Sequence, residues 1–209
     1  MKTLSQLSGG LDSVASTLLV AKSGDEFRTI FFDIDQPYMM KELMAVKYFD
    51  EWLKDRFVNY KGLKIVKADL ALDSSHGPSE YIPVRNLVLG ALSANQALSV
   101  GYGAVAVGSK TVEVRPDDPY SFSDCSISFY DQMGSLATFA SENQLLIFTM
   151  PLVDKGIALS KKQVIELLIE EGVDVKKLWS CYGIKEEYCG VCYHCAEIKK
   201  TGYWDYFIK

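Results

Sequence analysis

Apolar runs of strand length alternate along the chain with segments whose apolar residues recur at helical spacing. The strand-like runs are "TIFFDI" (29–34), "LKIVKADL" (63–70), "GAVAVGS" (103–109) and "LLIFTMPL" (145–152), and a short strand precedes residue 8. Helical patterns cover residues 12–22, about 39–54, about 84–100, about 128–142 and about 160–172. The last of these is expected to begin after Ser160, a suitable cap, and to end at Gly172. The alternation predicts an α/β fold, in which a mainly parallel sheet carries helices on both faces.

The stretch "SGGLDS", which begins at Ser8, lies where the first strand is expected to end and a helix to begin. Ligands of parallel sheets bind at the carboxyl ends of strands, and a helix N-terminus offers free N–H groups to an anion. Gly9 and Gly10 let a ligand approach the backbone closely. Ser13 adds a hydroxyl donor, and Asp12 could hold a metal ion that bridges phosphate oxygens. The stretch predicts a phosphate site, with a glycine turn and an ordinary helix cap as the alternative.

The composition is that of a globular protein with one substantial core, because 48% of the 209 residues are hydrophobic and 23% are charged. A net charge of −5 counts against a general nucleic-acid-binding surface. The most apolar helical pattern, "LVLGALSANQALSV", is interrupted by Asn95 and Gln96, so no membrane span is expected. The N-terminus lacks the pattern of a signal peptide, and we therefore expect a cytoplasmic protein whose cysteines are not in disulfides.

Four of the five cysteines lie close together near the C-terminus, at Cys181, Cys189, Cys192 and Cys195. Two overlapping C-x-x-C turns can bring thiolates to one tetrahedral ion, and the first cysteine can fold back as the fourth ligand. This spacing predicts one structural zinc ion per chain. Thiol exchange and an iron–sulfur cluster are the alternatives. His194 is expected to be a bystander, because four thiolates already fill the shell.

The cysteine cluster divides the chain into two expected units. Residues 1–177 would form the α/β domain, and residues 178–209 would form a zinc-binding module packed on it. The aromatic tail "GYWDYFIK" is expected to be part of the core of this module rather than a surface for a partner. The fifth cysteine, Cys125, is expected to be a small, inert hydrophobic residue.

Six segments resemble, in the same order, the PP-loop ATP pyrophosphatases and, more narrowly, the 7-cyano-7-deazaguanine synthase family. "SGGLDS" is similar to the pyrophosphate loop of that family, and "WSCYG…CGVCYHC" is similar to its zinc module. Between them lie "FFDIDQPYMMKELMAVK", "YIPVRN" (81–86), "DPYSFSDC" (118–125) and "MPLVDKGIALSKKQVI", which resemble further segments of the family. The resemblance spans the chain and implies a Rossmann-like PP-loop fold with a small C-terminal zinc module.

The chain departs from the family pattern at three places. Ser126 stands where the family usually has an arginine, directly after the Asp-Cys pair. Ile198, followed by Lys199 and Lys200, stands where the family has another arginine, and Tyr38 replaces a histidine. Neither serine nor lysine reproduces the bidentate fork of arginine. The departures therefore concern the substrate contacts, while the ATP machinery matches the family.

The resemblance implies an ATP-dependent carbon–nitrogen ligase of queuosine-type base biosynthesis. It would convert 7-carboxy-7-deazaguanine and ammonia to 7-cyano-7-deazaguanine through adenylated intermediates, with Mg²⁺ accompanying ATP and with ammonia taken from solution. ATP would be bound by Ser8, Gly9, Gly10, Leu11, Asp12 and Ser13. Asp12, Arg85 and Lys161 would be catalytic, and Gln36, Arg85, Asp118 and Asp124 would bind the substrate. A homodimer is compatible with the resemblance.

Other functions share part of this pattern. A PP-loop amide ligase could stop at the 7-amido product or use another substrate, and a tRNA-modifying thiolase or lysidine synthase also contains "SGGLDS". The acidic composition counts against a tRNA substrate. A non-catalytic nucleotide-binding protein, or a zinc-mediated interaction protein, is the third class. Each candidate residue also has a non-functional interpretation. Arg85 and Lys161 could be solvated surface charges, and Asp118 and Asp124 could be residues that form turns.

Overall fold

The computed structural model describes residues 1–70, 82–114 and 122–208 of the chain. Within these residues, five parallel strands form one sheet in the order β3-β2-β1-β4-β5. The strands are β1 (Thr3–Gln6), β2 (Phe27–Asp33), β3 (Tyr60–Lys67), β4 (Ala104–Ala106) and β5 (Ile147–Thr149). The chain proceeds outward from β1 to β3 and then returns to the other side of β1, so the strand order reverses between β1 and β4.

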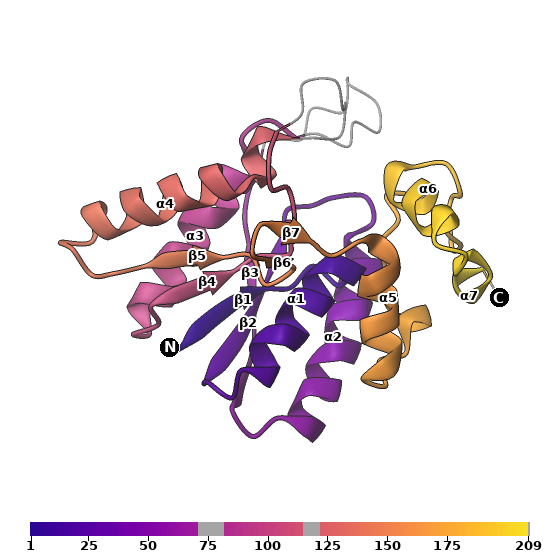
Figure 1. Cartoon of the computed structure of the whole chain (residues 1–209), viewed down its shortest axis with the longest axis horizontal. Helices are drawn as coiled ribbons and strands as arrows, with labels where there is room; N and C mark the ends of the chain where they lie inside the picture. Colours follow the sequence, from indigo (N-terminus) through magenta and orange to yellow (C-terminus); the bar gives the residue numbers. More distant parts are fainter. Residues whose placement is uncertain (71–81, 115–121, 209) are drawn as a thin grey trace.

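Helices cover both faces of this sheet (Figure 1). One face carries α1 (Leu11–Lys22), α2 (Met39–Arg56) and α5 (Lys161–Glu170), and the other carries α3 (Arg85–Ser99) and α4 (Ile127–Ala140). The α/β fold predicted from the sequence, a parallel sheet covered on both faces, is confirmed. Among the residues that the structure describes, no helix is both long and apolar enough to cross a membrane.

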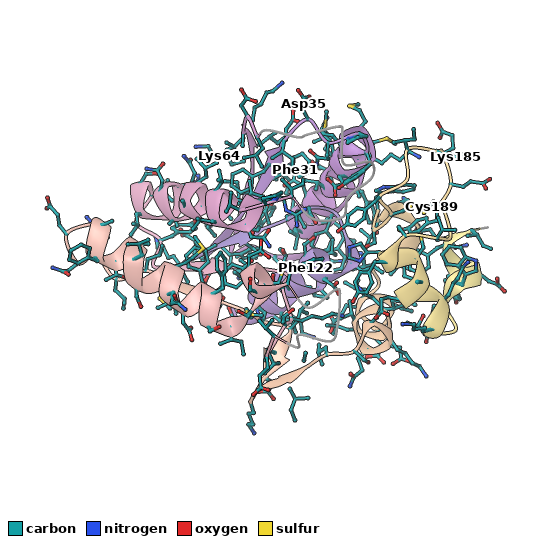
Figure 2. All side chains as sticks on the ribbon, turned by 90° about the horizontal axis from the view of Figure 1, so that it is seen from above. Phe31, Asp35, Lys64, Phe122, Lys185 and Cys189 are labelled. Atoms are coloured by element: carbon teal, nitrogen blue, oxygen red, sulfur yellow. The ribbon has the colours of Figure 1, made fainter. Side chains whose placement is uncertain are left out.

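Strand β2 shows how one segment supplies the cores on both faces. Phe27 and Phe31 are buried in the hydrophobic cluster on the side of α1 and α2, whereas Ile30 and Phe32 belong to the cluster on the side of α3 and α4. Figure 2 labels Phe31 in the interior of the molecule. Successive side chains of a strand point to opposite faces, so a strand that is covered on both faces is apolar almost throughout.

The C-terminal segment (residues 178–208) packs against the face that carries α1, α2 and α5. It follows the short helix η3 (Val175–Lys177) and contains α6 (Tyr193–Lys200) and α7 (Trp204–Phe207), which lie beside α5 at one end of the molecule (Figure 1). Cys195, Ile198 and Phe207 are buried in the same hydrophobic cluster as residues of α1. The aromatic tail therefore contributes to the core, as the sequence predicts, although Tyr206 is exposed.

The helix predicted after Ser160 is present, and its N-terminus is a capping box. Ser160 Oγ accepts a hydrogen bond from the Gln163 N–H, and Gln163 Oε1 accepts one from the Ser160 N–H. The sequence did not predict the antiparallel pair β6 (Val153–Asp154) and β7 (Ile157–Ala158), the turn η2 (Ser123–Cys125), or the two short C-terminal helices. Elements this short contain too few residues to show a hydrophobic period.

Candidate active site

A cavity of about 340 Å³ opens at the carboxyl ends of β1 and β4, where the strand order reverses. Open α/β sheets bind ligands at this position, and the volume suits a small molecule. Of the residues predicted to form the site, the cavity is lined by Ser8, Gly10, Leu11, Asp12, Ser13, Gln36 and Arg85. Phe122 also lines the cavity. In Figure 2 it lies with helices α3 and α4 on one side and the C-terminal segment, which holds Cys189, on the other.

The loop between β1 and α1 requires a glycine at position 9. Gly9 has a φ angle of +80°, in the left-handed region that favours glycine. A Cβ atom at Gly9 would lie 2.8 Å from the backbone oxygen of Glu42 and 2.9 Å from Ala45 Cβ, so the loop packs directly on α2. Gly10 is the extended N-cap of α1 and provides no side-chain cap. The N-terminus of α1 is therefore available to an anion in the cavity.

Hydroxyl groups organise this loop. Ser8 and Ser13 have their Oγ atoms 3.0 Å apart, and the Ser8 N–H donates to Ser13 Oγ at 3.1 Å. Ser13 Oγ also donates to the Gly10 carbonyl oxygen at 3.0 Å. The Leu11 N–H, predicted to bind phosphate, donates to Ser180 Oγ at 2.8 Å. A hydroxyl of the C-terminal segment thus lies at the amide where a phosphate oxygen is expected.

Asp12 is paired with two lysines from distant parts of the chain. Lys161 Nζ lies 2.5 Å from Asp12 Oδ2, and Lys110 Nζ lies 3.6 Å from Asp12 Oδ1. Burial raises the pKa of Asp12, but the charges of Lys161 and Lys110 outweigh this effect and lower the pKa to about 2. The carboxylate is therefore ionised. Its Oδ1 atom is buried and accepts no hydrogen bond from any residue that the structure describes.

Lys161 is a buried cation at the first residue of α5. A positive charge in the first turn of a helix is disfavoured by the helix dipole, and burial adds a desolvation cost. The ion pair with Asp12 offsets both costs. Asp12 lines the cavity, and its carboxylate binds the ammonium group of Lys161. Lys161 therefore influences the charge in the cavity through Asp12.

Gln36 connects the end of β2 to the start of α2. Its Oε1 atom accepts a hydrogen bond from the Ile34 N–H at 3.1 Å, and its Nε2 atom donates to Glu42 Oε2. Gln36 and Glu42 both line the cavity. Burial raises the pKa of Glu42 to about 7, although the hydrogen bond from Gln36 and the charge of Arg85 oppose this shift. Glu42 therefore presents a carboxyl group that titrates near neutral pH.

Arg85 is the first residue of α3, and its half-buried side chain lines the cavity. The preceding residue, Val84, has a φ angle of +52°, which is unusual for a β-branched residue. The side chain of Asn86 donates to the Asp124 carbonyl oxygen at 3.1 Å and to Cys125 Sγ at 3.3 Å. These bonds join the start of α3 to η2, so two segments far apart in the sequence meet beside the cavity.

Asp118 and Asp124 are the other two residues predicted to contact the substrate. Asp118 lies outside the described residues. Asp124 is part of η2, next to the lining residues Phe122 and Cys125. Burial raises the pKa of the Cys125 thiol to about 11, and the nearby carboxylate of Asp124 adds to this shift. The thiol is therefore protonated at neutral pH, which favours a packing role for Cys125 over that of a nucleophile.

The three departures from the family pattern have separate structural roles. Ser126 is buried and caps α4, since its Oγ atom accepts a hydrogen bond from the Phe129 N–H at 3.3 Å. Ile198 is fully buried in the hydrophobic cluster of α1 and α5. Neither position supplies a cation to the cavity. Tyr38, in contrast, lines the cavity, and its ring centroid lies 5.4 Å from that of Tyr182.

The structure brings the four clustered cysteines together. The Sγ atoms of Cys181, Cys189, Cys192 and Cys195 all lie within 4.8 Å of one another. A tetrahedral zinc site with Zn–S bonds of about 2.3 Å places its sulfurs about 3.8 Å apart, and the sulfurs of Cys189 and Cys195 are 3.9 Å apart. The Gly183 N–H donates to Cys181 Sγ at 3.1 Å, so a backbone hydrogen bond helps to hold this sulfur in the cluster. The cluster can hold a metal ion, and its donor set fits zinc.

His194, expected to be a bystander, lines the cavity. Its Nε2 atom lies 2.9 Å from Tyr182 Oη, and the two rings pack edge to face with centroids 4.9 Å apart. Burial, reinforced by the charge of Lys161, lowers the pKa of His194 to about 4. The ring is therefore neutral at pH 7. Four thiolates complete a tetrahedral metal shell without it.

Comparison with known families agrees with this geometry. The family model described as "Queuosine biosynthesis protein QueC" matches residues 2–206. The chain belongs to this family. QueC-family relatives include the 7-cyano-7-deazaguanine synthase of Campylobacter curvus, which is 28% identical over 209 residues that cover 93% of this chain and 89% of that protein. The synthase of Sulfurovum sp. is 29% identical over 209 residues, covering 93% of this chain and 90% of that protein.

A solved structure supports the fold of this QueC-family chain. The U34-tRNA thiolase NcsA from Methanococcus maripaludis, described with its [4Fe-4S] cluster, is similar with a TM-score of 0.53. The match covers 99% of this chain and 69% of the thiolase at 11% sequence identity. At this identity the likeness shows the fold alone, and it supports the parallel α/β architecture. The family resemblance drawn from the six segments is confirmed by the family match.

Glu42, Lys110, Ser180 and Tyr182 are among the lining residues of this QueC-family site that sequence reasoning missed, and His194, which it took for a bystander, lines the cavity as well. Lys110 could have been found, because it follows the carboxyl end of β4, the position where parallel sheets bind ligands. Ser180 and Tyr182 flank the first cysteine of the cluster. No sequence signal indicates that the metal-binding segment folds over the end of the sheet, and that contact alone brings these residues to the cavity.

Proposed function

We propose that the chain is an ATP-dependent ligase that converts 7-carboxy-7-deazaguanine and ammonia to 7-cyano-7-deazaguanine in the biosynthesis of queuosine-type bases. One observation carries the proposal: the ionised Asp12, with Lys161 and Lys110, lies at a glycine-rich helix N-terminus in a member of the QueC family. This combination suits ATP phosphates. The names of the relatives, both 7-cyano-7-deazaguanine synthases, support the identity of the base.

In this proposal, the β- and γ-phosphates of ATP lie over the loop between β1 and α1. The backbone of Gly9 and Gly10 permits their close approach, and the Leu11 N–H donates to a phosphate oxygen in place of Ser180 Oγ. Ser8 and Ser13 hold the loop in shape through their mutual hydrogen bond and add hydroxyl groups to the site. Lys161 and Lys110 supply positive charge beside it.

The residues also fit a magnesium ion. Asp12 Oδ1 is a buried, ionised oxygen without a hydrogen-bond partner among the described residues, and Mg²⁺ prefers one or two such carboxylate oxygens together with phosphate oxygens and water. Asp12 would hold this ion. When bound, Mg²⁺ would neutralise negative charge on the departing pyrophosphate.

The proposed reaction activates an unreactive carboxylate twice. The carboxylate oxygen of the base attacks the α-phosphorus of ATP, which gives an acyl-adenylate and releases pyrophosphate. Ammonia adds to the activated carbon and displaces AMP, leaving the amide after loss of a proton. The amide oxygen then attacks the α-phosphorus of a second ATP and releases pyrophosphate, and loss of AMP and of both amide protons leaves the nitrile. Both carboxylate oxygens leave on AMP, so the reaction consumes two ATP per nitrile.

Two cations are proposed to act during the adenylation steps. Lys161, held by Asp12, and Arg85, at the start of α3, would neutralise the charge that develops at the α-phosphate. Substrate contacts are assigned to Arg85, Gln36, Asp118 and Asp124. The amide of Gln36 is engaged with Ile34 and Glu42, so it would act on the substrate chiefly by fixing the shape of the cavity.

The cysteine cluster is proposed to hold one structural zinc ion. Its four sulfurs leave no open coordination position, so the metal would stabilise the chain without taking part in chemistry. In this account, residues 178–209 form a zinc-stabilised module that packs on a nucleotide-binding domain of residues 1–177. Ser180 and His194 connect the module to the site, because Ser180 bonds to Leu11 and His194 lines the cavity.

The direct test is product analysis. Purified protein is incubated with 7-carboxy-7-deazaguanine, an ammonium salt enriched in nitrogen-15, and ATP with Mg²⁺, and the base is identified by mass spectrometry. The expected product is the nitrile carrying one labelled nitrogen, together with AMP and pyrophosphate. If neither labelled nitrile nor labelled amide forms and no ATP is consumed, the assignment of the substrate is overturned. If ADP and phosphate are the only products formed from ATP, the enzyme class is overturned.

One observation favours a second candidate, a ligase that stops at the amide. Neither Ser126 nor Ile198 supplies a cation to the cavity where related chains are expected to have arginines, because Ser126 caps a helix and Ile198 is buried in the core. The second adenylation starts from an amide oxygen, which is a weaker nucleophile than a carboxylate. Accumulation of labelled amide without nitrile in the same assay identifies this candidate.

A further inference from the structure

His194 has one ring nitrogen with a partner and one without. The Nε2 atom lies 2.9 Å from Tyr182 Oη. The Nδ1 atom is buried and forms no hydrogen bond with any residue that the structure describes. Burying a ring nitrogen without a partner costs free energy, and buried polar atoms in folded proteins are nearly always paired. The ring lines the cavity, so a bound ligand can supply the partner.

A role as metal ligand does not explain the orientation of this ring. Four sulfurs already lie within 4.8 Å of one another, which completes a tetrahedral shell. The imidazole is instead held by Tyr182, both through Nε2 and through edge-to-face packing. The neighbouring Tyr193 ring also packs against the imidazole, with centroids 5.4 Å apart. The ring is fixed in place, as a group that binds a ligand must be.

The charges around His194 indicate what the ligand offers. The charges of Lys161, Asp12, Cys192 and Lys110 act on its imidazole. The ring lines the same cavity as Asp12 and Lys110, where the phosphates of ATP are proposed to bind. Two lysines and one carboxylate leave this part of the cavity net positive. An anionic oxygen is the group that such a site stabilises.

We propose that His194 is a nucleotide-binding residue whose Nδ1–H donates a hydrogen bond to a phosphate oxygen of bound ATP. In this arrangement Tyr182 Oη donates to Nε2 and thereby fixes the tautomer that carries its proton on Nδ1. The metal-binding segment then contributes directly to the ATP site, because His194 lies between the cysteines Cys192 and Cys195. The inference rests on the proposed ATP chemistry and adds a phosphate contact to it.

Two substitutions distinguish the role of Nδ1 from that of Nε2. The side-chain amide of asparagine places its NH₂ near the position of Nδ1, whereas the longer side chain of glutamine places it near Nε2. His194→Asn therefore retains a donor to the phosphate, and His194→Gln and His194→Ala lose it. A hydrogen bond to a charged oxygen corresponds to roughly a 10-fold change in affinity or more.

The measurement is the dissociation constant of a non-hydrolysable ATP analogue, and of adenosine as a ligand without phosphate, by titration calorimetry. We expect His194→Gln and His194→Ala to bind the analogue roughly 10-fold more weakly than the original chain, and His194→Asn to stay within about 3-fold. Adenosine should bind all four proteins equally. Equal losses in the Asn and Gln variants, or an equal loss for adenosine, would overturn the proposal.

Metal content and thermal stability are measured on every variant, because His194 lies next to two metal-binding cysteines. If a His194 variant loses its metal, Tyr182→Phe provides the second test, since it removes the hydroxyl partner of Nε2 and leaves the residues between Cys192 and Cys195 unchanged. It should weaken binding of the analogue and not of adenosine; unchanged binding overturns the proposed tautomer. Failure of the original chain to bind the analogue would instead overturn the proposed function.

Discussion

Asp12 and Lys161 are 149 positions apart in the sequence, and Lys161 Nζ lies 2.5 Å from Asp12 Oδ2. The contact joins the first turn of α1 to the first residue of α5. It places a buried cation beside the glycine-rich loop, where ATP phosphates are proposed to bind. The chain offers a matched comparison for this cation, because the next residue, Lys162, is exposed and its Nζ lies 3.7 Å from Glu166 Oε1.

Replacing Lys161 should therefore affect catalysis far more than replacing Lys162. Lys161→Met removes the charge but keeps a side chain of similar length, and we expect the rate of AMP release to fall by roughly 100-fold or more. Lys162→Met should change this rate by less than about twofold, because exposed ion pairs contribute little. Steady-state assays of AMP release give the comparison. Equal effects of the two substitutions would contradict the role of Lys161.

Substitutions at Gly9 and Gly24 distinguish the cost of backbone strain from the cost of a steric clash. Both have positive φ angles, +80° and +83°, but a Cβ atom would meet backbone and side-chain atoms of α2 only at Gly9. Gly24→Ala should cost about 1 kcal/mol of unfolding free energy from strain alone. Gly9→Ala should cost more and should also raise the KM for ATP. Urea unfolding and steady-state kinetics provide the measurements, and equal losses of stability would show that the loop is not packed as described.

The cysteine cluster predicts a specific metal content. Elemental analysis of the purified protein should find about one zinc ion per chain. Cys192→Ser should remove the metal and lower the melting temperature, because metal binding stabilises the folded segment. Cys125→Ser is the control, since Cys125 lies outside the cluster and should leave the metal in place. Iron with labile sulfide, or no metal at all, would contradict the assignment of zinc.

Glu42 should make the free energy of unfolding depend on pH. Burial raises its pKa from 4.5 to about 7, so the folded chain keeps a proton that the unfolded chain releases. Stability is therefore lost as the pH rises from 4.5 to about 7. Glu42→Gln removes this titration and still offers an oxygen to Gln36 Nε2, so its advantage over the original chain should grow from pH 5 to pH 8, by up to about 3 kcal/mol.

The measurement for Glu42 is urea unfolding of both proteins at several pH values without nucleotide. Glu51→Gln is the matched control, because it removes an exposed carboxylate from the same helix. A difference between Glu42→Gln and the original chain that stays constant from pH 5 to pH 8 would show that Glu42 is not buried as described.

The fold was predictable because its main elements have clear periods. Strand β2 is apolar on both faces, which indicated a strand inside a covered parallel sheet. The glycines of the loop at residues 8–13 and the cap residue Ser160 marked two helix starts correctly. The short helices α6 and α7 could not be predicted, because they are held by packing against the core and not by their own periodicity.

The candidate site was predictable only where a motif lies in one continuous stretch. The loop at residues 8–13 lines the cavity, and the four cysteines come together, as expected from spacing alone. His194 was expected to be a bystander because four thiolates already fill the metal shell. Its place in the cavity depends on how the C-terminal segment folds over the end of the sheet. That long-range contact has no signature in a single sequence.

The central claim is that both oxygens of the carboxylate leave on AMP, and oxygen labelling tests it most directly. The substrate is 7-carboxy-7-deazaguanine with both carboxyl oxygens replaced by oxygen-18, supplied with ammonia, ATP and Mg²⁺. Mass spectrometry should find two AMP molecules per nitrile, each with one labelled oxygen, and no label in pyrophosphate. Label in water, in inorganic phosphate or retained in the final base would contradict activation by successive adenylation.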